Sequence, residues 1–519
     1  MNNFKRISLF CCITFAFAGM VFAADYHFDS KAGDDGRDGL SAQTAWKTLI
    51  KAESVKFKAG DRILLKRGSV FSGKLALKGV TGKKDAPVMI DAYGDGKALP
   101  KIDAAGYVAA VDIEDTEHIS LSNLEITSNG GEAIDKEAKV VRFGVNILKS
   151  SHVSLKELYI HDVFATVQSE SEGKDRTTAY GQGVQIRSST IVTVSKCIIE
   201  KVGRYGIVAG KNSHNLKFLQ NKTDHTGGSG IQMSFCSDVL ISGNRIDHPG
   251  SFIDERMHGR GSGSWVFLCK DILYERNEFL NANGKADSCG VHIDSKNRNV
   301  VIQYCFSMNN AGGFIEILGH NYNCAYRYNI SVNDGFRVKR KAGAIQHGKV
   351  LWLSGFGGDS PAGPFNSYIY NNTVYVKEGQ RSCFYVEETT KGVLIANNIF
   401  HLLSPTIDVT DGPKQEIKPT RGHVVFANNV YINGSVLPPS LHIQDSKPII
   451  GDAKFKNPGG TKSEDYIPAN AGLLKDKGMV IEKIPGDEKG LSIGLEVSND
   501  YFGNPIKGPP DIGAVELSK

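Results

Sequence analysis

Three carboxylates and a histidine fall close together in the second half of the chain. Asp287, His292 and Asp294 lie in one short segment, and Glu316 lies in the next apolar segment. Glycoside hydrolysis needs two carboxyl groups, one to protonate the leaving oxygen and one to act as base or nucleophile. We predict that Asp294 and Glu316 form this pair, and that Asp287 is a third carboxylate able to take either role.

The alternation of apolar and polar residues predicts how these side chains are oriented. Aligning Gly290 with Gly312 makes Asp294 and Glu316 neighbours on adjacent strands, which lie about 4.8 Å apart in a sheet. Two carboxylates so close cannot both ionise freely, so the pKa of one should rise. The other positions divide into outward-facing His292 and Phe314 and inward-facing Val291, Ile293, Gly313 and Ile315.

A basic loop precedes the three acids. Arg256 and Arg260 could form charge-assisted bonds to a uronate or a sulfate, and the alternative is a salt bridge with Asp254 or Glu255. Trp265 either stacks on a sugar ring or belongs to the core. The residues predicted to contact substrate are His292, Arg256, His258, Arg260, Trp265 and Lys296; Arg204 and Tyr205 are candidates to extend the groove.

A nine-residue phrase that recurs along the chain explains how these residues are positioned. Its second, fourth and ninth positions are mostly Val, Ile, Leu or Phe, which indicates a short strand. A short period with a strand in each repeat is typical of a solenoid. The phrases begin at His118, His152, Ile191, Asn215, Asp238, Asp271, Asn299, Asn323, Asn366, Gly392 and His423.

The seventh position of the phrase favours one kind of solenoid. It is Asn in seven of the eleven phrases, at Asn221, Asn244, Asn277, Asn329, Asn372, Asn398 and Asn429. Asn accepts the left-handed backbone conformation and can hydrogen-bond to identical neighbours along a stack. We therefore predict an all-β chain, a right-handed parallel β-helix with N-terminal and C-terminal caps, in which these Asn are structural.

The ends of the chain indicate export. Residues 1–23 combine Lys5 and Arg6 with an apolar stretch that ends in small residues, the pattern of a secretory signal peptide. Residues 24–117 are expected to form the N-terminal cap and first coils, with a helix over Ala45 to Phe57. Residues 118–435 form the regular helix with the groove, and 436–519 the C-terminal cap. The expected location is secreted or periplasmic.

Composition sets limits on the partners. The formal net charge of +5 is too small to favour nucleic acid, and no apolar stretch beyond the signal predicts a membrane span. The nine cysteines lack the paired spacing of a zinc site or a disulfide framework, and most are expected to be buried. We expect a monomer that acts on a polysaccharide or oligosaccharide, without cofactor or metal.

Further motifs point to a known superfamily. The opening 26–36, the segment 60–68, the repeated strands and the ending 511–516 resemble the secreted right-handed parallel β-helix proteins. That pectate lyase-like superfamily includes pectate lyases, chondroitinase B, alginate lyases, polygalacturonases and β-helical glycosidases. The resemblance implies a carbohydrate-active enzyme, but it does not identify a subfamily, because different reactions share this scaffold.

Two other functions remain open from the sequence. The stretch 293–296 is similar to the surroundings of the catalytic lysine in chondroitinase B and alginate lyases, which would make Lys296 the base of a β-elimination with calcium as the neutralising cation. The likeness ends one coil later, where this chain has Glu316. The second alternative is a non-catalytic glycan-binding surface protein. Hydrolysis is the preferred interpretation.

Overall fold

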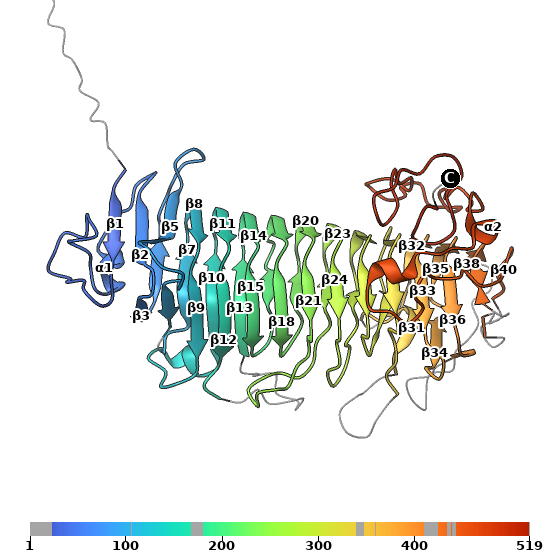
Figure 1. Cartoon of the computed structure of the whole chain (residues 1–519), viewed down its shortest axis with the longest axis horizontal. Helices are drawn as coiled ribbons and strands as arrows, with labels where there is room; N and C mark the ends of the chain where they lie inside the picture. Colours follow the sequence, from blue (N-terminus) through green and yellow to red (C-terminus); the bar gives the residue numbers. More distant parts are fainter. Residues whose placement is uncertain are drawn as a thin grey trace, which may run out of the picture.

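The structure, a computed structural model, consists of three long parallel sheets (Figure 1). It describes residues 23–104, 106–167, 180–338, 347–358, 360–408, 424–432, 437–438 and 443–517, so the predicted signal peptide lies almost wholly outside the described residues. Each coil of the chain contributes one strand to each sheet, as β25, β26 and β27 do in turn. The prediction of a right-handed parallel β-helix is confirmed.

The strands of the three sheets have the following bounds. Sheet A contains β1 (Asp25–Phe28), β2 (Arg62–Lys66), β5 (Val88–Tyr93), β8 (Glu117–Ser122), β11 (Ser151–Lys156), β14 (Thr190–Ser195), β17 (His214–Leu219), β20 (Ser237–Ser242), β23 (Lys270–Glu275), β26 (Arg298–Gln303), β29 (Ala325–Arg327), β32 (Phe365–Tyr370), β35 (Lys391–Ala396) and β38 (Val424–Ala427). Sheet B contains β3 (Val70–Ser72), β6 (Lys101–Asp103), β9 (Glu125–Asn129), β12 (Tyr159–Phe164), β15 (Ile198–Val202), β18 (Lys222–Thr226), β21 (Arg245–Asp247), β24 (Glu278–Leu280), β27 (Phe306–Met308), β30 (Ile330–Val332), β33 (Thr373–Val376), β36 (Ile399–Leu402), β39 (Val430–Tyr431) and β40 (Ile449–Ile450). Sheet C contains β4 (Leu75–Lys78), β7 (Ala109–Glu114), β10 (Val141–Leu148), β13 (Tyr180–Arg187), β16 (Ile207–Gly210), β19 (Ile231–Ser234), β22 (Ser264–Phe267), β25 (Val291–Ile293), β28 (Gly313–Ile317), β31 (Lys349–Leu353), β34 (Ser382–Val386) and β37 (Thr406–Asp408).

Alternate residues of each strand fill one continuous core. On sheet A, Val192 pairs with Leu216, Leu216 with Val239 and Val239 with Ile272, so identical faces stack from coil to coil. The core runs from Phe28 near the N-terminal end to the last coils. Burial of apolar surface along this stack is the main stabilising contribution, because each coil covers the next.

The first residue of the repeated phrase is a fixed bend. At each phrase start from His118 to Gly392, φ lies between +47° and +67°, in the left-handed region; His423 lies outside the described residues. The sixth position of the phrase has the same conformation, as at Asn123, Gln220 and Asn428. The phrase is therefore the sheet A strand with a left-handed residue at each end, and this bend turns the chain toward the next sheet.

The Asn of the seventh position form a ladder inside the bend, as predicted, but they do not adopt the left-handed conformation themselves. Asn221 donates through Nδ2 to Oδ1 of Asn244 at 3.0 Å, and Asn244 donates to Asn277 at 2.9 Å. Each also donates to a backbone carbonyl, such as Phe218 O at 2.8 Å for Asn244. The sixth residue adopts the left-handed conformation, which leaves the seventh side chain pointing inward.

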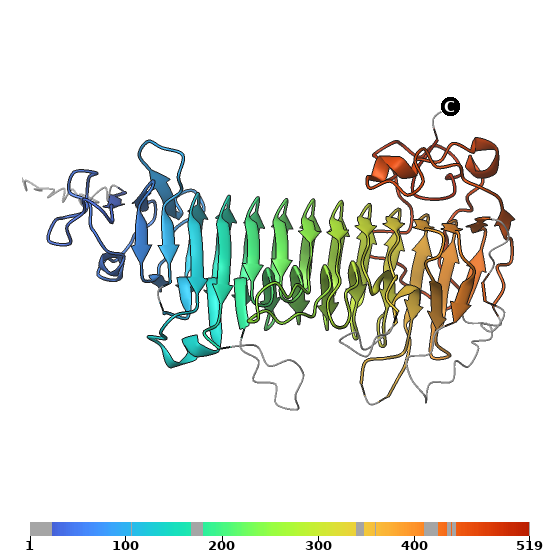
Figure 2. The same ribbon diagram turned by 60° about the horizontal axis from the view of Figure 1, so that its bottom comes forward.

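The terminal regions are less regular than the coils (Figures 1 and 2). Of the helix expected over Ala45 to Phe57, only α1 (Ile50–Glu53) is helical, although Trp46 and Leu49 join the core. At the other end, residues 443–517 include α2 (Ala471–Leu474) and pack along the outside of sheets A and B. Short 3-10 helices occur at Lys136–Lys139 and Ser463–Tyr466.

Two further sequence predictions concern cysteines and membranes. All seven cysteines in the described residues are buried free thiols, as expected for small apolar side chains in the stack. Among the described helices, none combines the length and apolar character needed to cross a membrane.

Candidate active site

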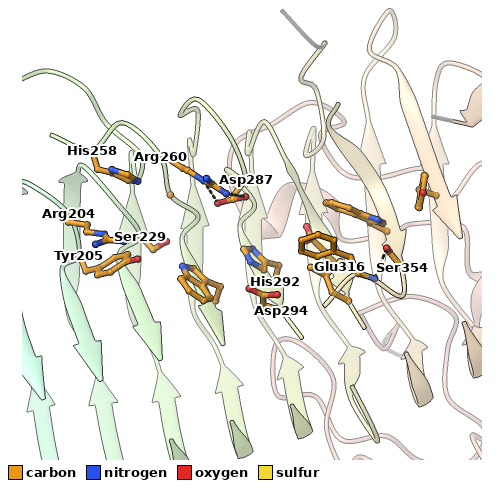
Figure 3. Close-up of a pocket in the computed structure, with 16 residues that line it drawn as sticks. Arg204, Tyr205, Ser229, His258, Arg260, Asp287, His292, Asp294, Glu316 and Ser354 are labelled. Atoms are coloured by element: carbon orange, nitrogen blue, oxygen red, sulfur yellow. Dashed lines mark hydrogen bonds and ion pairs between the residues drawn. The ribbon is translucent and has the colours of Figure 1, made fainter. Parts of the chain in front are cut away.

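A cavity of about 690 Å³ lies on the outer side of sheet C (Figure 3). Its lining comes from the coils of seven consecutive strands, β16 to β34, so it extends about 29 Å along the helix at the usual strand spacing. The lining residues are Arg204, Tyr205, Ser229, His258, Arg260, Gly261, Trp265, Asp287, His292, Asp294, Glu316, Leu318, Trp352, Ser354, Phe356 and Tyr385. All three predicted carboxylates are among them.

The register of the strands corrects the predicted carboxylate pair. Ile293 pairs with Ile317, which places His292 beside Glu316 and sets Asp294 level with Leu318. Asp294 and Glu316 are therefore diagonal neighbours and not direct ones. The predicted alignment of Gly290 with Gly312 is two residues out of register.

Phe314 explains why that alignment is wrong. Its ring is 1% exposed and packs against Tyr326 in the core, with centroids 5.4 Å apart, and so it does not face outward as predicted. A Cβ at Gly290 would lie 2.4 Å from Ser307 Oγ and 3.1 Å from Phe314 Cδ2, so this glycine makes room for both side chains. Gly312 is small for another reason, since a Cβ there would lie 2.0 Å from the Asp287 carbonyl oxygen.

Glu316 is the most buried of the three acids. It is 4% exposed, and Oε2 accepts a hydrogen bond from the Cys289 thiol at 2.9 Å. Burial raises the pKa of Glu316, while the nearby His292 and the Cys289 thiol partly oppose that rise. This carboxyl group is held toward its neutral form and is covered by its neighbours.

Asp287 is held toward its ionised form. Arg260 Nε donates to Oδ2 at 2.9 Å and Nη2 donates to Oδ1 at 3.3 Å, which is the bidentate arrangement of a strong ion pair. Burial works to raise the pKa of Asp287, but the Arg260 charge and its hydrogen bonds lower it below the ordinary value.

The chain makes a left-handed turn at Asp287. Asp287 and Ser288 both have positive φ, at 51° and 63°, although neither is glycine. Arg337 Nη2 donates to the Asp287 carbonyl at 3.1 Å, and Gly312 N donates to the Ser288 carbonyl at 2.8 Å, so the surrounding coils hold this turn. Lys211 and Asn212 have the same succession of positive φ, so such a turn belongs to the architecture of the stack.

Asp294 occupies the floor of the cavity at the end of β25. Burial raises its pKa, and the hydrogen bond from Ser295 N to Oδ1 at 2.6 Å only partly offsets this. Its backbone carbonyl accepts bonds from Asn297 at 2.7 Å and Asn321 at 2.5 Å. A second Asn ladder, at the bend after sheet C, therefore fixes the position of this acid.

The rings of His292 and Trp265 stack on each other in the cavity. The two residues pair on adjacent strands, and their rings are 5° from parallel with centroids 6.1 Å apart. His292 Nδ1 lies 3.2 Å from Ser262 Oγ, which orients the imidazole. Trp265 lines the cavity, so the alternative in which it belongs to the core is wrong.

The other predicted contact residues divide into two groups. His258 and Arg260 line the cavity. Arg256 does not: it pairs with Asp254 at 2.6 Å, bonds Asn129 at 2.9 Å and covers the ring of Phe164, so it follows the salt-bridge alternative. Lys296, the predicted base of an elimination, is exposed and also lies outside the lining.

Sequence reasoning missed the far end of the cavity. Trp352 and Tyr385 meet edge to face with centroids 6.2 Å apart, and Phe356 is 65% exposed beside them. These residues come from β31, β34 and the loop after β31. The 43-residue step between the phrases at Asn323 and Asn366 was the signal that a long loop would stand here.

One buried cluster at the cavity wall has donor atoms suited to a metal ion. Cys289 Sγ, a His292 ring nitrogen and a Glu316 oxygen lie within 4.8 Å of one another. Sulfur, imidazole and carboxylate together match the preferences of zinc. The Cys289 thiol is protonated over the usual pH range, because burial and the Glu316 carboxylate raise its pKa well above the ordinary value.

Comparison with known proteins agrees with this architecture. The family model for the right-handed β-helix region matches residues 104–349. The chain is a right-handed parallel β-helix protein, and its sheet C bears a cavity with three acids.

The chain is similar to a lacto-N-biosidase in sequence and to two solved structures in fold. Lacto-N-biosidase of Bifidobacterium longum subsp. longum is 25% identical, over 95% of this chain and 36% of the relative, so the chain spans about a third of that protein. The structure of the GH136 lacto-N-biosidase of Eubacterium ramulus is 23% identical, with a TM-score of 0.53 over 72% of this chain and 68% of the other. The complex of XylC with xylose is 12% identical, with a TM-score of 0.55 over 96% and 99% of the two chains.

Proposed function

We propose that this protein is a glycoside hydrolase that cleaves an oligosaccharide or polysaccharide bound along sheet C. The observation that carries the proposal is the presence of Asp287 and Asp294 in one cavity, with their pKa values moved in opposite directions. Two carboxyl groups whose environments separate their pKa values can divide the roles of proton donor and of base or nucleophile. The relationship to lacto-N-biosidases supports the same reaction class.

The geometry modifies the pair that the sequence predicted. Glu316 remains in the site, but it is almost wholly buried and bonded to Cys289. Asp287 and Asp294 are more exposed and line the same cavity, so they are the acids that a bound glycan can reach. In this proposal the neutral form of Glu316 adds no negative charge beside Asp287 and Asp294. Glu316 also packs beside His292 and helps to hold it in position.

The residues around the acids have defined tasks in the reaction. Arg260 holds Asp287 in place and favours its charged form in the free protein. Burial favours the protonated form of Asp294 up to a higher pH than usual. Trp265, backed by His292, offers an aromatic ring to a sugar, and the aromatic end at Trp352 and Tyr385 extends the binding surface.

The test is an activity assay on a panel of neutral, sulfated and uronate-containing glycans. Reducing ends and the ultraviolet absorbance of unsaturated uronates are followed together. The proposal expects reducing ends without absorbance, and Asp287→Asn and Asp294→Asn should each lower kcat by about 10²-fold or more. Asp238→Asn is the control, because Asp238 is exposed on β20 of another sheet.

Two outcomes would count against the proposal. Absorbance rising together with reducing ends would mean elimination and would direct attention to Lys296 and a cation. Binding without turnover, unchanged by the carboxylate variants, would indicate a glycan-binding protein. We also propose export to the periplasm or the medium, which a size comparison of the precursor and the exported protein would test.

A further inference from the structure

One end of the cavity is basic. Figure 3 shows Arg204, Tyr205 and His258 together at the end away from Glu316, with the Arg260–Asp287 ion pair between the two ends. Arg260 is matched by Asp287. In the described part of the chain, Arg204 forms no ion pair with a carboxylate, and its guanidinium lies over Tyr205.

Arg204 is held in place without using its full hydrogen-bonding capacity. Its guanidinium lies over two aromatic rings, 4.8 Å from the centroid of Tyr205 and 5.6 Å from that of Tyr180. Its Nε is buried and, among the described residues, has no hydrogen-bond partner. The side chain lines the cavity, so its guanidinium can pair with an anionic ligand there. Stacked arginine is also pre-oriented for a planar anion.

The pKa of His258 reflects the positive charges at this end of the cavity. Burial, and then the charges of Arg204, Arg260 and Lys285, lower the pKa of His258 to about 4. The imidazole is therefore neutral at ordinary pH and does not compete for an anion by charge. It lines the cavity beside Arg204.

From this arrangement we propose that the Arg204 end of the cavity binds an anionic substituent, a carboxylate or a sulfate, on the glycan that the protein cleaves. The inference rests on the proposed hydrolase function and narrows its substrate to acidic glycans. Arg204 precedes β16, three strands from β25 of the catalytic acids, or about 14 Å at the usual strand spacing. The anionic group therefore belongs to a sugar away from the bond that is cleaved.

The test measures binding of matched monosaccharides that differ only at carbon 6. Glucose, glucuronate and glucose 6-sulfate, and the corresponding galactose series, are titrated against the protein by NMR. Because a charge-assisted hydrogen bond is worth roughly a tenfold change in affinity or more, at least one anionic sugar should bind roughly tenfold more tightly than its neutral parent. Raising the salt concentration should reduce this preference.

Variants connect the preference to Arg204. Arg204→Met should abolish it while leaving the affinity for the neutral sugar within about threefold, and Arg204→Lys should keep part of it because the charge remains. Arg298→Met is the matched control, since Arg298 also lies over a tyrosine ring, 4.5 Å from the Tyr322 centroid, but outside the cavity. Circular dichroism confirms that each variant is folded.

A second readout comes from His258. If an anion binds beside it, the pKa of His258 should rise on titration with the anionic sugar and stay unchanged with the neutral one, as followed by the imidazole carbon signals. Tightening by glucuronate alone would assign a carboxylate site, and tightening by the sulfated sugar alone a sulfate site.

Equal affinity for neutral and anionic sugars, or a preference that survives in Arg204→Met, would overturn the inference. Because these measurements need no turnover, that outcome differs from failure of the proposed function. The latter would appear as absence of hydrolysis across the glycan panel, whatever the binding preference.

Discussion

Two guanidinium nitrogens of Arg260 donate hydrogen bonds to the carboxylate oxygens of Asp287 on the neighbouring coil, at 2.9 Å and 3.3 Å. The pairing places a fixed positive charge against one of the two acids proposed for catalysis. It leaves Asp294, on the same coil as Asp287, in a setting that favours its neutral form. A single ion pair thus separates the behaviour of two carboxyl groups seven residues apart.

Replacing Arg260 by Met should move one limb of the pH profile. The Arg260 charge lowers the pKa of Asp287, so its loss raises that pKa and the limb governed by Asp287 moves to higher pH. The measurement is kcat/KM against pH, which reports groups of the free enzyme. Movement of the acid limb would assign Asp287 as base or nucleophile, and movement of the alkaline limb would assign it as proton donor. A profile that keeps its shape would contradict the role given to the pair.

Removing the indole of Trp265 should weaken substrate binding more than it slows the chemical step. The ring lies parallel to His292 and offers a face to a sugar. Loss of a stacking surface of this kind is worth roughly 1–2 kcal/mol, so Trp265→Ala should raise KM by about 10-fold with a smaller change in kcat. Phe267→Ala on the same strand is the control, because Phe267 packs against Phe235 and does not line the cavity. Equal effects of the two substitutions would argue for a structural role.

Glu316→Gln should make the protein less sensitive to alkaline pH. Burial raises the pKa of Glu316 in the folded state, so the stability that its neutral form contributes is present below the unfolded pKa and is lost as pH rises through the folded pKa. Glutamine stays neutral at every pH. Urea unfolding at several pH values from 4 to 8 should therefore show a smaller decline for the variant than for the wild type. Parallel pH profiles would mean that Glu316 is not destabilised by ionisation.

Asn244→Ala should destabilise the stack without touching the cavity. The substitution removes bonds to Asn277 and to the Phe218 carbonyl and leaves the amide of Asn221 without its acceptor. Buried groups left unpaired typically cost about 1–3 kcal/mol each, so we expect a loss of roughly 2–4 kcal/mol in the free energy of unfolding. Lys217→Ala on the exposed face of sheet A should change it by less than about 0.5 kcal/mol. Unfolding in urea compares the two.

Much of this molecule follows from the period of its sequence. A phrase that returns with two polar bends and an alternating strand can bury its apolar side chains only against copies of itself, so the repeat determines a parallel stack. The same repeat predicts that His292 and Asp294 share one outer face, because side chains two apart on a strand point the same way. The Asn ladder is visible in the sequence for the same reason.

The exact neighbours on that face depended on the tertiary structure. Gly290 and Gly312 look equivalent in the sequence, yet the strand pairing sets them two residues out of register. Gly290 makes room for the Ser307 and Phe314 side chains, and Gly312 for a carbonyl oxygen. Arg256 and Arg260 lie four residues apart, but the loop directs only Arg260 into the cavity. Periodicity determines which face a residue takes, whereas register and loop direction depend on packing between coils, which the one-dimensional pattern does not encode.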